Sequence, residues 1–388
     1  MQRGTSAGKR ALFISSFAPV LENGRALRTY SVIRALVVHG PLDVVYVPFP
    51  VEEPSPEFAA IEGVSYHVVR PSRGVRRLGH HARLRATGLP ERVARSASPE
   101  LVDEATRRAA ERGRGLIVAG DFSTMAALMP LARRRPLVYN AHNVESSYRP
   151  SSDRVGIHHA LLRRTERQVL TAAAESWMVS RRDMELAESL APSARVRYVP
   201  NVVDVERIAP VPTRARGRTI LMVADFLYGP NVTGAEWLVR EVLPRVWSQL
   251  PDVRLLMVGR ESHRVQGADD PRIKRPGFVA DLRGAYLEAT TVAVPLVLGG
   301  GTPLKFIEAL AYGVPVVSTA IAARGLSVQD REHFRQGDDA VSYADALVDL
   351  LQHGDAAMAA RARALVEREY SLQALVTAIT EPATGASS

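Results

Sequence analysis

The stretch TVAVPLVLGGGTPLKFIEALAYGVPVVST, residues 291–319, decides the fold that the sequence predicts. It begins with an apolar run at 292–297, which is typical of a short strand buried on both faces. Three consecutive glycines at 299–301 follow the run, and an apolar segment with helical spacing follows the glycines. The stretch therefore predicts a strand, a glycine loop, a helix and a second strand in that order.

Start and stop signals bound the predicted helix. Thr302 is a good N-cap residue, and Pro303 suits the first helical position, where its missing N–H has no consequence. Gly313 fits the left-handed conformation that ends many helices, and Pro315 prevents continuation. We therefore expect the helix to begin directly after Thr302.

The start of this helix is a candidate anion site. Backbone N–H groups of Gly300, Gly301 and Thr302 would point at one spot, together with the positive end of the helix dipole. Lys305 in the first turn opposes that dipole by roughly 0.3–1 kcal/mol, so a bound phosphate explains it better. Glu308 shares the face of Lys305 and could accept hydrogen bonds from sugar hydroxyls. A capped helix with an exposed Lys–Glu pair is the alternative.

Composition narrows the class of protein. A chain of 388 residues that is 46% apolar predicts two domains, each with a sizeable core. It has no run of 18 uncharged apolar residues, and its first residues do not resemble a signal peptide. The chain has no cysteine, which excludes disulfides, thiolate metal ligands and cysteine nucleophiles. We expect a cytoplasmic protein.

The positive charge is concentrated in the first half. Residues 1–200 carry a net charge of +11 and residues 201–388 a net charge of −2. The segment 71–99 breaks the regular pattern and should leave the sheet as an excursion. Arginines cluster in and beside it: Arg70, Arg73, Arg76, Arg77, Arg83 and Arg85. They could meet an anionic membrane, placing the protein peripherally on its inner face, or an acidic acceptor, or they could simply be solvated. Nucleic acid is not expected, because aromatic residues are not interleaved with the arginines.

Strands and helices alternate along the whole chain. In the first half we expect strands at 10–15, 42–47, 116–119, 137–140 and 176–179, and helices at 24–39, 100–111, 157–173 and 181–190. In the second half we expect strands at 219–223, 253–258, near 277–278 and within 291–319, and helices at 232–246, 282–289, 340–353, 355–369 and 371–380.

This alternation predicts an α/β fold with two Rossmann-like, doubly wound parallel sheets facing each other across a cleft. The predicted domains are 1–203 and 204–370, and 371–388 is expected to be a terminal helix that crosses back to the first domain and ends in a frayed tail. Ligands of such sheets bind beyond the carboxyl ends of the strands, so the active site is expected in the cleft.

Four segments in this order resemble the GT-B glycosyltransferases, and within them the retaining, sugar-nucleotide-dependent glycosyltransferase family 4. They are VPNVVD (199–204), LPDVRLLMVGR (250–260), PGFVADLRGAY (276–286) and the glycine loop with its helix. In the first half, YNAHNVE (139–145) is similar to the family's histidine-bearing turn. The resemblance implies an acceptor-side first domain and a nucleotide-sugar-binding second domain.

The resemblance also implies roles for individual residues. His142, Lys305 and Arg260 match catalytic positions, with the two cations on the donor diphosphate and His142 near the transferred sugar. Positions that match donor-binding residues are Gly24, Arg25, Gly277, Phe278, Val279, Gly300, Gly301, Thr302, Leu304 and Glu308. Gly277, Phe278 and Val279 would lie against the nucleobase, and Glu308 would bind the ribose.

Two positions depart from the family pattern. The first glutamate of the family's two-glutamate motif falls at Gly300, so one contact to the sugar is missing or comes from the backbone. The loop after the first strand of the second domain, where many members have an Arg and a Lys, reads ADFLYGPN and begins at Ala224. Arg260 and Lys305 would then carry more of the phosphate charge.

The implied function is transfer of a sugar, with retention of configuration, from a nucleotide-diphosphate donor to a saccharide, glycolipid or small-molecule acceptor. A UDP or GDP sugar is the expected co-substrate, with no other cofactor and no metal site. Cell-envelope polysaccharide assembly in a bacterium is the expected setting, with a saccharide or lipid-linked acceptor as partner. A sugar-nucleotide epimerase on the same fold and a non-catalytic nucleotide-sugar-binding protein are the alternatives.

Overall fold

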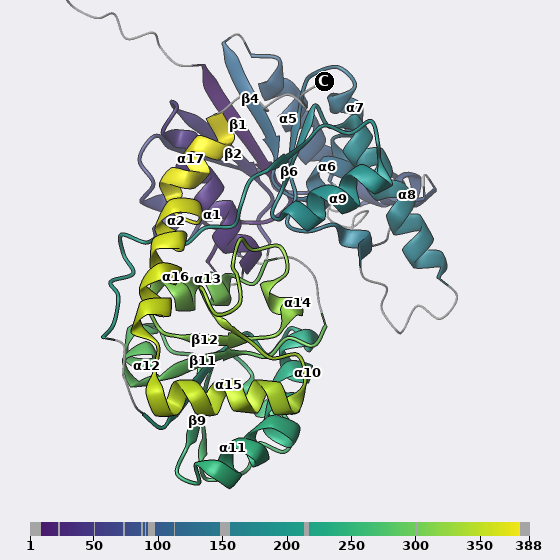
Figure 1. Cartoon of the computed structure of the whole chain (residues 1–388). Helices are drawn as coiled ribbons and strands as arrows, with labels where there is room; N and C mark the ends of the chain where they lie inside the picture. The colour runs from purple at the N-terminus through teal and green to yellow at the C-terminus, as the bar shows by residue number, and fades with distance from the viewer. Residues whose placement is uncertain are drawn as a thin grey trace, which may run out of the picture. The chain divides into compact units, whose positions relative to one another are not determined.

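The computed structural model describes residues 9–21, 24–49, 51–72, 74–86, 88–89, 91, 98–111, 113–147, 156–212, 217–298 and 302–380. These residues form two compact units, which are described separately (Figure 1). The first unit takes its residues from the chain up to Pro200 and from Leu375 onward. The second unit is Asn201–Ala374.

The first unit is a seven-stranded parallel sheet with helices between the strands. Its sheet has the order β3-β2-β1-β4-β5-β6-β7. The strands are β1 (Arg10–Ser15), β2 (Leu42–Tyr46), β3 (Val64–Val68), β4 (Arg114–Ala119), β5 (Val138–Asn140), β6 (Glu175–Met178) and β7 (Val196–Tyr198). The helices are α1 (Gly24–Val37), α2 (Pro56–Ala59), α3 (Val75–Ala86), α5 (Pro99–Ala109), α6 (Phe122–Ala127), α7 (Met129–Ala132), the short η1 (Glu145–Ser147), α8 (Ile157–Ala172) and α9 (Arg181–Leu190).

The second unit contains a six-stranded parallel sheet with the order β10-β9-β8-β11-β12-β13. Its strands are β8 (Thr219–Val223), β9 (Arg254–Val258), β10 (Ile273–Gly277), β11 (Thr291–Val294), β12 (Val316–Ser318) and β13 (Arg335–Gln336). Its helices are α10 (Gly229–Trp237), η2 (Leu238–Val242), α11 (Leu243–Gln249), η3 (Ser262–Arg264), α12 (Arg283–Glu288), α13 (Leu304–Ala311), α14 (Ala320–Ala323), α15 (Ala340–His353) and α16 (Ala356–Glu369). The last helix, α17 (Leu372–Thr380), starts in this unit and ends in the first.

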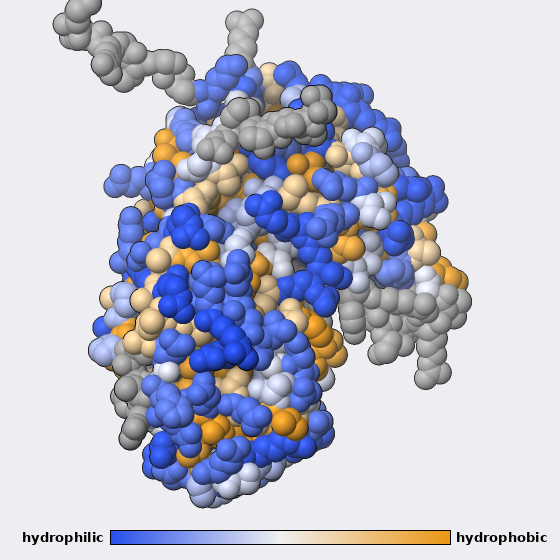
Figure 2. Space-filling view, in the orientation of Figure 1, coloured by the Kyte–Doolittle hydropathy of each residue, from blue (hydrophilic) through white to orange (hydrophobic). Residues whose placement is uncertain are grey.

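Alternating side chains of the strands build the cores of both units. In β8, Ile220 and Met222 belong to one apolar cluster and Leu221 to a second, because successive residues point to opposite faces of the sheet. The first unit has its own cluster, which includes Leu12 and Ile14 of β1. Hydrophilic residues dominate the face shown in Figure 2. Among the described residues, no helix combines the length and apolar character needed to cross a membrane.

Both sheets reverse their winding direction at one place. In the first sheet this switch point lies between β1 and β4, and in the second between β8 and β11. Crevices at the carboxyl ends of such strand pairs are the usual ligand sites of doubly wound sheets. The fold class predicted from strand–helix alternation is confirmed, with two parallel α/β sheets.

The structure differs from the predictions in several local details. The helix after the glycine loop begins at Leu304, and Pro303, in extended conformation, occupies the N-cap position without a side-chain hydrogen bond. Thr302 is therefore one residue too early to cap it. Phe278 lies outside β10, which ends at Gly277 with a positive φ of 79°. The described residues of the arginine-rich segment at 71–99 add no strand to the sheet, in agreement with the predicted excursion, but they contain the regular helix α3.

The predicted helix 232–246 is divided by a π-helical turn, η2, between α10 and α11. Pro244 lies in the first turn of α11. Proline has no N–H to continue the i→i−4 hydrogen-bond ladder, so the helix widens before it.

Candidate active site

Four side chains from three segments are connected at the switch point of the second sheet. The Lys305 ammonium of α13 donates to Oδ1 of Asn231 at the start of α10, over 2.5 Å. The amide of Asn231 donates in turn to the backbone carbonyl of Asp225, over 2.7 Å. Arg260, which follows β9, pairs through Nη2 with the Asp225 carboxylate at 2.6 Å. The structure therefore links the two predicted diphosphate cations through residues of the ADFLYGPN loop.

Two glycines allow the segments around this network to approach closely. A Cβ on Gly259 would lie 1.7 Å from the carbonyl oxygen of Ala224, and its φ is +140°. A Cβ on Gly234 would lie 2.3 Å from the carbonyl oxygen of Pro295. Only glycine fits these positions, so β9 can end against the loop after β8, and α10 can pack on the segment after β11.

Burial shifts the proton affinities of both charged residues of α13. It lowers the pKa of Lys305 from 10.5 to about 7, because a desolvated ammonium is disfavoured. Burial raises the pKa of Glu308 from 4.5 to about 7. In the described part of the chain, the Glu308 carboxylate makes no hydrogen bond or ion pair that would offset its desolvation. Such shifted groups at a strand-end crevice are typical of functional sites.

Glu308 lies near a stacked pair of tyrosines. The rings of Tyr286 and Tyr312 have centroids 4.0 Å apart and an interplanar angle of 18°. Burial, and then the nearby Glu308 charge, raises the pKa of both tyrosines. The tyrosine pair therefore forms part of the surroundings of the Glu308 carboxylate.

The other predicted donor-binding residues of the second unit fall into four groups. Gly277 ends β10, and its carbonyl accepts from the N–H of Gly259, which precedes Arg260. Phe278 follows with 71% of its surface exposed, and Val279 is packed against the apolar cluster. Thr302 is buried, and Leu304 begins α13. Gly300 and Gly301 lie outside the described residues.

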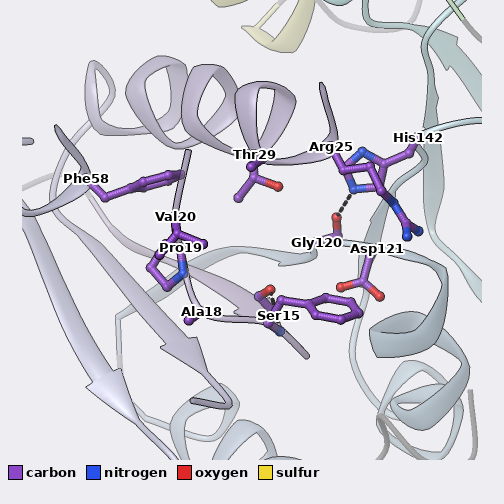
Figure 3. Close-up of a pocket in the computed structure, with 12 residues that line it drawn as sticks. Ser15, Ala18, Pro19, Val20, Arg25, Thr29, Phe58, Gly120, Asp121 and His142 are labelled. Carbon is purple, nitrogen blue, oxygen red and sulfur yellow. Dashed lines mark hydrogen bonds between the residues drawn. The ribbon is translucent and has the colours of Figure 1, made fainter. Parts of the chain in front are cut away.

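A pocket lies at the switch point of the first sheet (Figure 3). Its volume is about 120 Å³. One part of its lining is apolar and includes Pro19, Val20 and Phe58, while another carries the polar groups of Arg25, Asp121 and His142. The complete lining is Ser15, Phe17, Ala18, Pro19, Val20, Arg25, Ala26, Thr29, Phe58, Gly120, Asp121 and His142.

His142 is a neutral imidazole in this pocket. Its Nε2 lies 3.0 Å from the carbonyl oxygen of Gly120, so Nε2 carries the proton and donates to that oxygen (Figure 3). Its Nδ1 is buried and has no hydrogen-bond partner among the described residues. Burial, followed by the positive charges of Arg25 and Arg28, holds the pKa of His142 well below its usual range. Nδ1 is therefore a hydrogen-bond acceptor.

The structure brings the predicted residue Arg25 to the same pocket. Arg25 lies in the first turn of α1, which begins at Gly24, and it forms an ion pair of 3.3 Å with Glu145. Glu145 follows His142 in the YNAHNVE turn. The first strand-to-helix segment and the histidine turn are therefore joined by a charged contact.

Two buried carboxylates that the sequence analysis did not identify hold the histidine turn. Glu166 of α8 accepts from the backbone N–H groups of Glu145 and Ser146, at 2.5 and 2.8 Å. Asp183 of α9 accepts from the N–H of Val144 at 3.3 Å. The available signal was an acidic residue inside each apolar helix face, since such residues are rarely buried without a partner.

Asp225 and Asn231 are the functional candidates whose roles sequence reasoning missed. They appeared only as departures from the family pattern. Asp225 lies directly after β8, and Asn231 lies in the first turn of the next helix, α10; this strand-to-helix position at the carboxyl edge of the sheet was the signal that could have identified them.

Solved structures with the same architecture cover almost the entire chain. The chain is similar to HepE of Anabaena in complex with UDP and glucose, with a TM-score of 0.68, 15% identity, and coverage of 96% of this chain and 98% of that one. It is also similar to sucrose-phosphate synthase from Thermosynechococcus elongatus, with a TM-score of 0.69, 18% identity, and coverage of 95% and 97%. The fold is GT-B.

A third GT-B structure is TarM of S. aureus in complex with Fondaparinux, alpha-GlcNAc-glycerol and UDP, with a TM-score of 0.66, 8% identity, and coverage of 95% and 98%. Residues 217–353, within the second unit, match the family model described as "Glycosyl transferases group 1". No curated protein sequence matches the chain. The family match and the GT-B fold together support a glycosyltransferase (EC 2.4).

Proposed function

We propose that the protein is a retaining glycosyltransferase that moves a sugar from a UDP or GDP sugar to a saccharide, glycolipid or small-molecule acceptor. The observation that carries the proposal is the linked pair of cations, Lys305 and Arg260, at the switch point of the second sheet. The structural neighbours HepE and TarM have UDP in their complexes, which supports a nucleotide donor. Retention of configuration rests on the resemblance of the four sequence segments.

In this proposal, Lys305 and Arg260 stabilise the diphosphate as the bond to the anomeric carbon breaks. Negative charge then moves onto the leaving group while the sugar becomes oxocarbenium-like. Cations that are already in place stabilise this change without reorganisation, and losing one such group typically reduces the rate by about 10²- to 10³-fold. The desolvated surroundings of Lys305 would strengthen its interaction with phosphate.

We assign the rest of the donor to residues around these cations. Glu308 would accept hydrogen bonds from the ribose hydroxyls, which would satisfy a carboxylate that is now desolvated. The exposed ring of Phe278 and the apolar edge of Val279 would contact the nucleobase after the turn at Gly277. Thr302 and Leu304, with Gly300 and Gly301, would border the phosphates.

In the first unit we assign His142 to a sugar hydroxyl. Its unpaired Nδ1 would accept a hydrogen bond from that hydroxyl, because the other ring nitrogen already donates to the Gly120 carbonyl. Gly24 and Arg25, at the start of α1, would contact phosphate or the acceptor. This role needs a neutral imidazole, and burial favours that form.

The test is a panel of nucleotides and nucleotide sugars with the purified protein. UDP or GDP should raise the melting temperature, and the matching sugar nucleotide should be consumed when acceptor is present. The anomeric configuration of the product, read by NMR, decides retention. Conversion of donor alone to a different sugar would indicate an epimerase, and tight binding without transfer or hydrolysis would indicate a binding protein. No response to any nucleotide would overturn the proposal.

We also propose peripheral contact of the first unit with the anionic inner face of a membrane, in the cytoplasm. Helix α3 presents Val75 and Leu78 with 85% and 68% of their surfaces exposed. Arg77, Arg83 and Arg85 of the same helix are exposed, and α3 contains no acidic residue. Apolar side chains among cations are typical of helices that lie on anionic lipid.

Vesicle sedimentation tests this contact. The triple variant Arg77→Glu, Arg83→Glu, Arg85→Glu should lose binding to vesicles that contain phosphatidylglycerol. The matched control makes the same change of charge at three exposed arginines elsewhere in the first unit, Arg133, Arg134 and Arg135, and should retain binding. If the α3 triple variant and the control triple variant bind these vesicles equally, the proposed contact is contradicted.

A further inference from the structure

The two cations of the second unit have partners of different charge. Arg260 pairs with the carboxylate of Asp225, which neutralises it, whereas Lys305 is held by the neutral amide oxygen of Asn231. An amide accepts one N–H of the ammonium without cancelling its positive charge. The network of four side chains therefore keeps one net positive charge when Lys305 is protonated, and that charge belongs to Lys305.

The backbone around Asp225 and Asn231 is held at several points. The N–H of Ala224 donates to the carbonyl of Val258, and the N–H of Phe226 donates to the carbonyl of Arg260. The N–H of Asn231 donates to the carbonyl of Tyr228. The loop therefore cannot move away from Arg260 without breaking main-chain hydrogen bonds.

Asn231 is well placed to orient the ammonium. Only 7% of its surface is exposed, and its amide group is used at both ends: the nitrogen donates to Asp225 and the oxygen accepts from Lys305. This double use fixes which end of the amide faces Lys305. A lysine side chain is long and flexible, so a fixed acceptor removes much of its conformational freedom before a ligand binds.

We propose that Asn231 is a positioning residue that directs Lys305 toward the donor diphosphate while leaving its charge available, and that Asp225 anchors both Asn231 and Arg260. This inference rests on the proposed function, since it needs a diphosphate at Lys305. In this proposal the ADFLYGPN loop positions Lys305 and Arg260, whereas the corresponding loop of many family members carries an Arg and a Lys of its own.

The proposal predicts that the substitution closest in shape to asparagine is the one that weakens nucleotide binding most. Asn231→Asp has nearly the shape of asparagine but adds a negative charge against Lys305, which cancels the charge meant for phosphate. Asn231→Ala removes the contact and adds no charge. Both substitutions lose the N–H that donates to the Asp225 carbonyl, so both should lower the melting temperature. A merely structural role predicts that nucleotide affinity falls in step with the melting temperature, whereas a positioning role predicts that Asp weakens nucleotide binding more than Ala does, beyond any difference in their melting temperatures.

The experiment measures affinity for UDP and GDP by isothermal titration calorimetry, on the full chain. For the nucleotide that the wild type binds, Asn231→Ala should weaken binding about threefold to tenfold and Asn231→Asp by more than tenfold. The matched control is Thr233→Asp, which adds the same charge at an exposed position of the same helix, and it should stay within about twofold. Melting temperatures of all variants verify that they are folded.

The outcomes separate this inference from the proposed function. A wild type that binds neither nucleotide overturns the proposed function and, with it, the role of Asn231. If the wild type binds and Asn231→Asp binds as tightly, or no more weakly than Asn231→Ala or Thr233→Asp, only the positioning role of Asn231 is overturned. A lower kcat in Asn231→Asp than in Asn231→Ala is the expected kinetic counterpart, because the cancelled charge is the one that stabilises the leaving diphosphate.

Discussion

Replacing Lys305 with methionine tests whether this residue is retained for binding at the expense of stability. Methionine keeps an unbranched side chain of similar length but removes the ammonium. Burial lowers the pKa of Lys305 from 10.5 to about 7 in the folded protein. Below pH 7 both the folded and unfolded chains carry the proton, and the folded chain must hold it in a desolvated position. This penalty fades as the pH rises from about 7 toward 10.5.

The size of the effect follows from the shift of the pKa. At 1.36 kcal/mol per pH unit, the shift corresponds to about 5 kcal/mol as an upper bound. By surface area Lys305 is intermediate between buried and exposed, so solvent screening reduces this to about 2–3 kcal/mol, and the lost hydrogen bond to Asn231 offsets about 1 kcal/mol of that. Lys305→Met should therefore raise the free energy of unfolding by about 1–2 kcal/mol at pH 6.

Urea unfolding at pH 6, 7.5 and 9 measures this difference. The stabilisation should shrink as the pH rises, because the wild type loses the buried charge and the variant has none to lose. Lys274→Met, at an exposed position of β10, is the matched control and should show no trend with pH. A variant less stable than the wild type at pH 6, or a difference that does not change with pH, would refute the reasoning.

The same variant should lose affinity for the nucleotide. A hydrogen bond from an ammonium to phosphate contributes about 1.5–3 kcal/mol, which corresponds to about 10- to 150-fold in Kd. Calorimetry with UDP or GDP measures this loss. Greater stability together with weaker binding is the combination that a purely structural lysine would not show.

Three further predictions concern single residues. Glu166→Ala should lower the free energy of unfolding by about 2–4 kcal/mol, because two backbone N–H groups of the histidine turn lose their acceptor. Urea unfolding measures this loss, and a loss below about 1 kcal/mol would contradict the role of Glu166 in holding the turn. Gly259→Ala should unfold the protein or cost more than about 3 kcal/mol, whereas Gly284→Ala, with open space around it, should be tolerated in the same assay. His142→Ala should reduce kcat by about tenfold or more with little change in melting temperature, and an unchanged kcat would exclude a contact with the transferred sugar.

Local patterns predicted most of the elements. Helix α15, Ala340–His353, has the predicted bounds because its signals are local: a capping box at Asp339 and an apolar stripe that includes Tyr343 and Leu347. The strands β3, β7 and β13 were missed because none of their residues is fully buried, so no buried apolar run marks them. Sequence patterns therefore predict elements best where the element carries its own start, stop and buried face.

The site was predictable only in its separate parts. Lys305 and its phosphate role could be inferred from its place in the first turn of the predicted helix, whereas Arg260 was identified only through the resemblance. Their connection through Asp225 and Asn231 joins residues up to 74 positions apart, and it depends on the close approach of backbones at Gly259 and Gly234. No spacing rule along one chain indicates such contacts, because they arise from the order of strands in the sheet.

The first unit is built from two separate parts of the chain, residues up to Pro200 and residues from Leu375 onward, so it cannot be produced as one continuous fragment. In that unit, Arg197 of β7 donates to the backbone carbonyls of Ala378 and Ile379, in the last turns of α17. A fragment that stops at Pro200 would lack those carbonyl oxygens and leave the β7 edge without the helix that belongs to it. A circularly permuted fragment, in which a linker joins the end of α17 to the start of β1 and the chain then stops at Pro200, would keep these carbonyl oxygens. It offers a route to the isolated first unit for ligand screening.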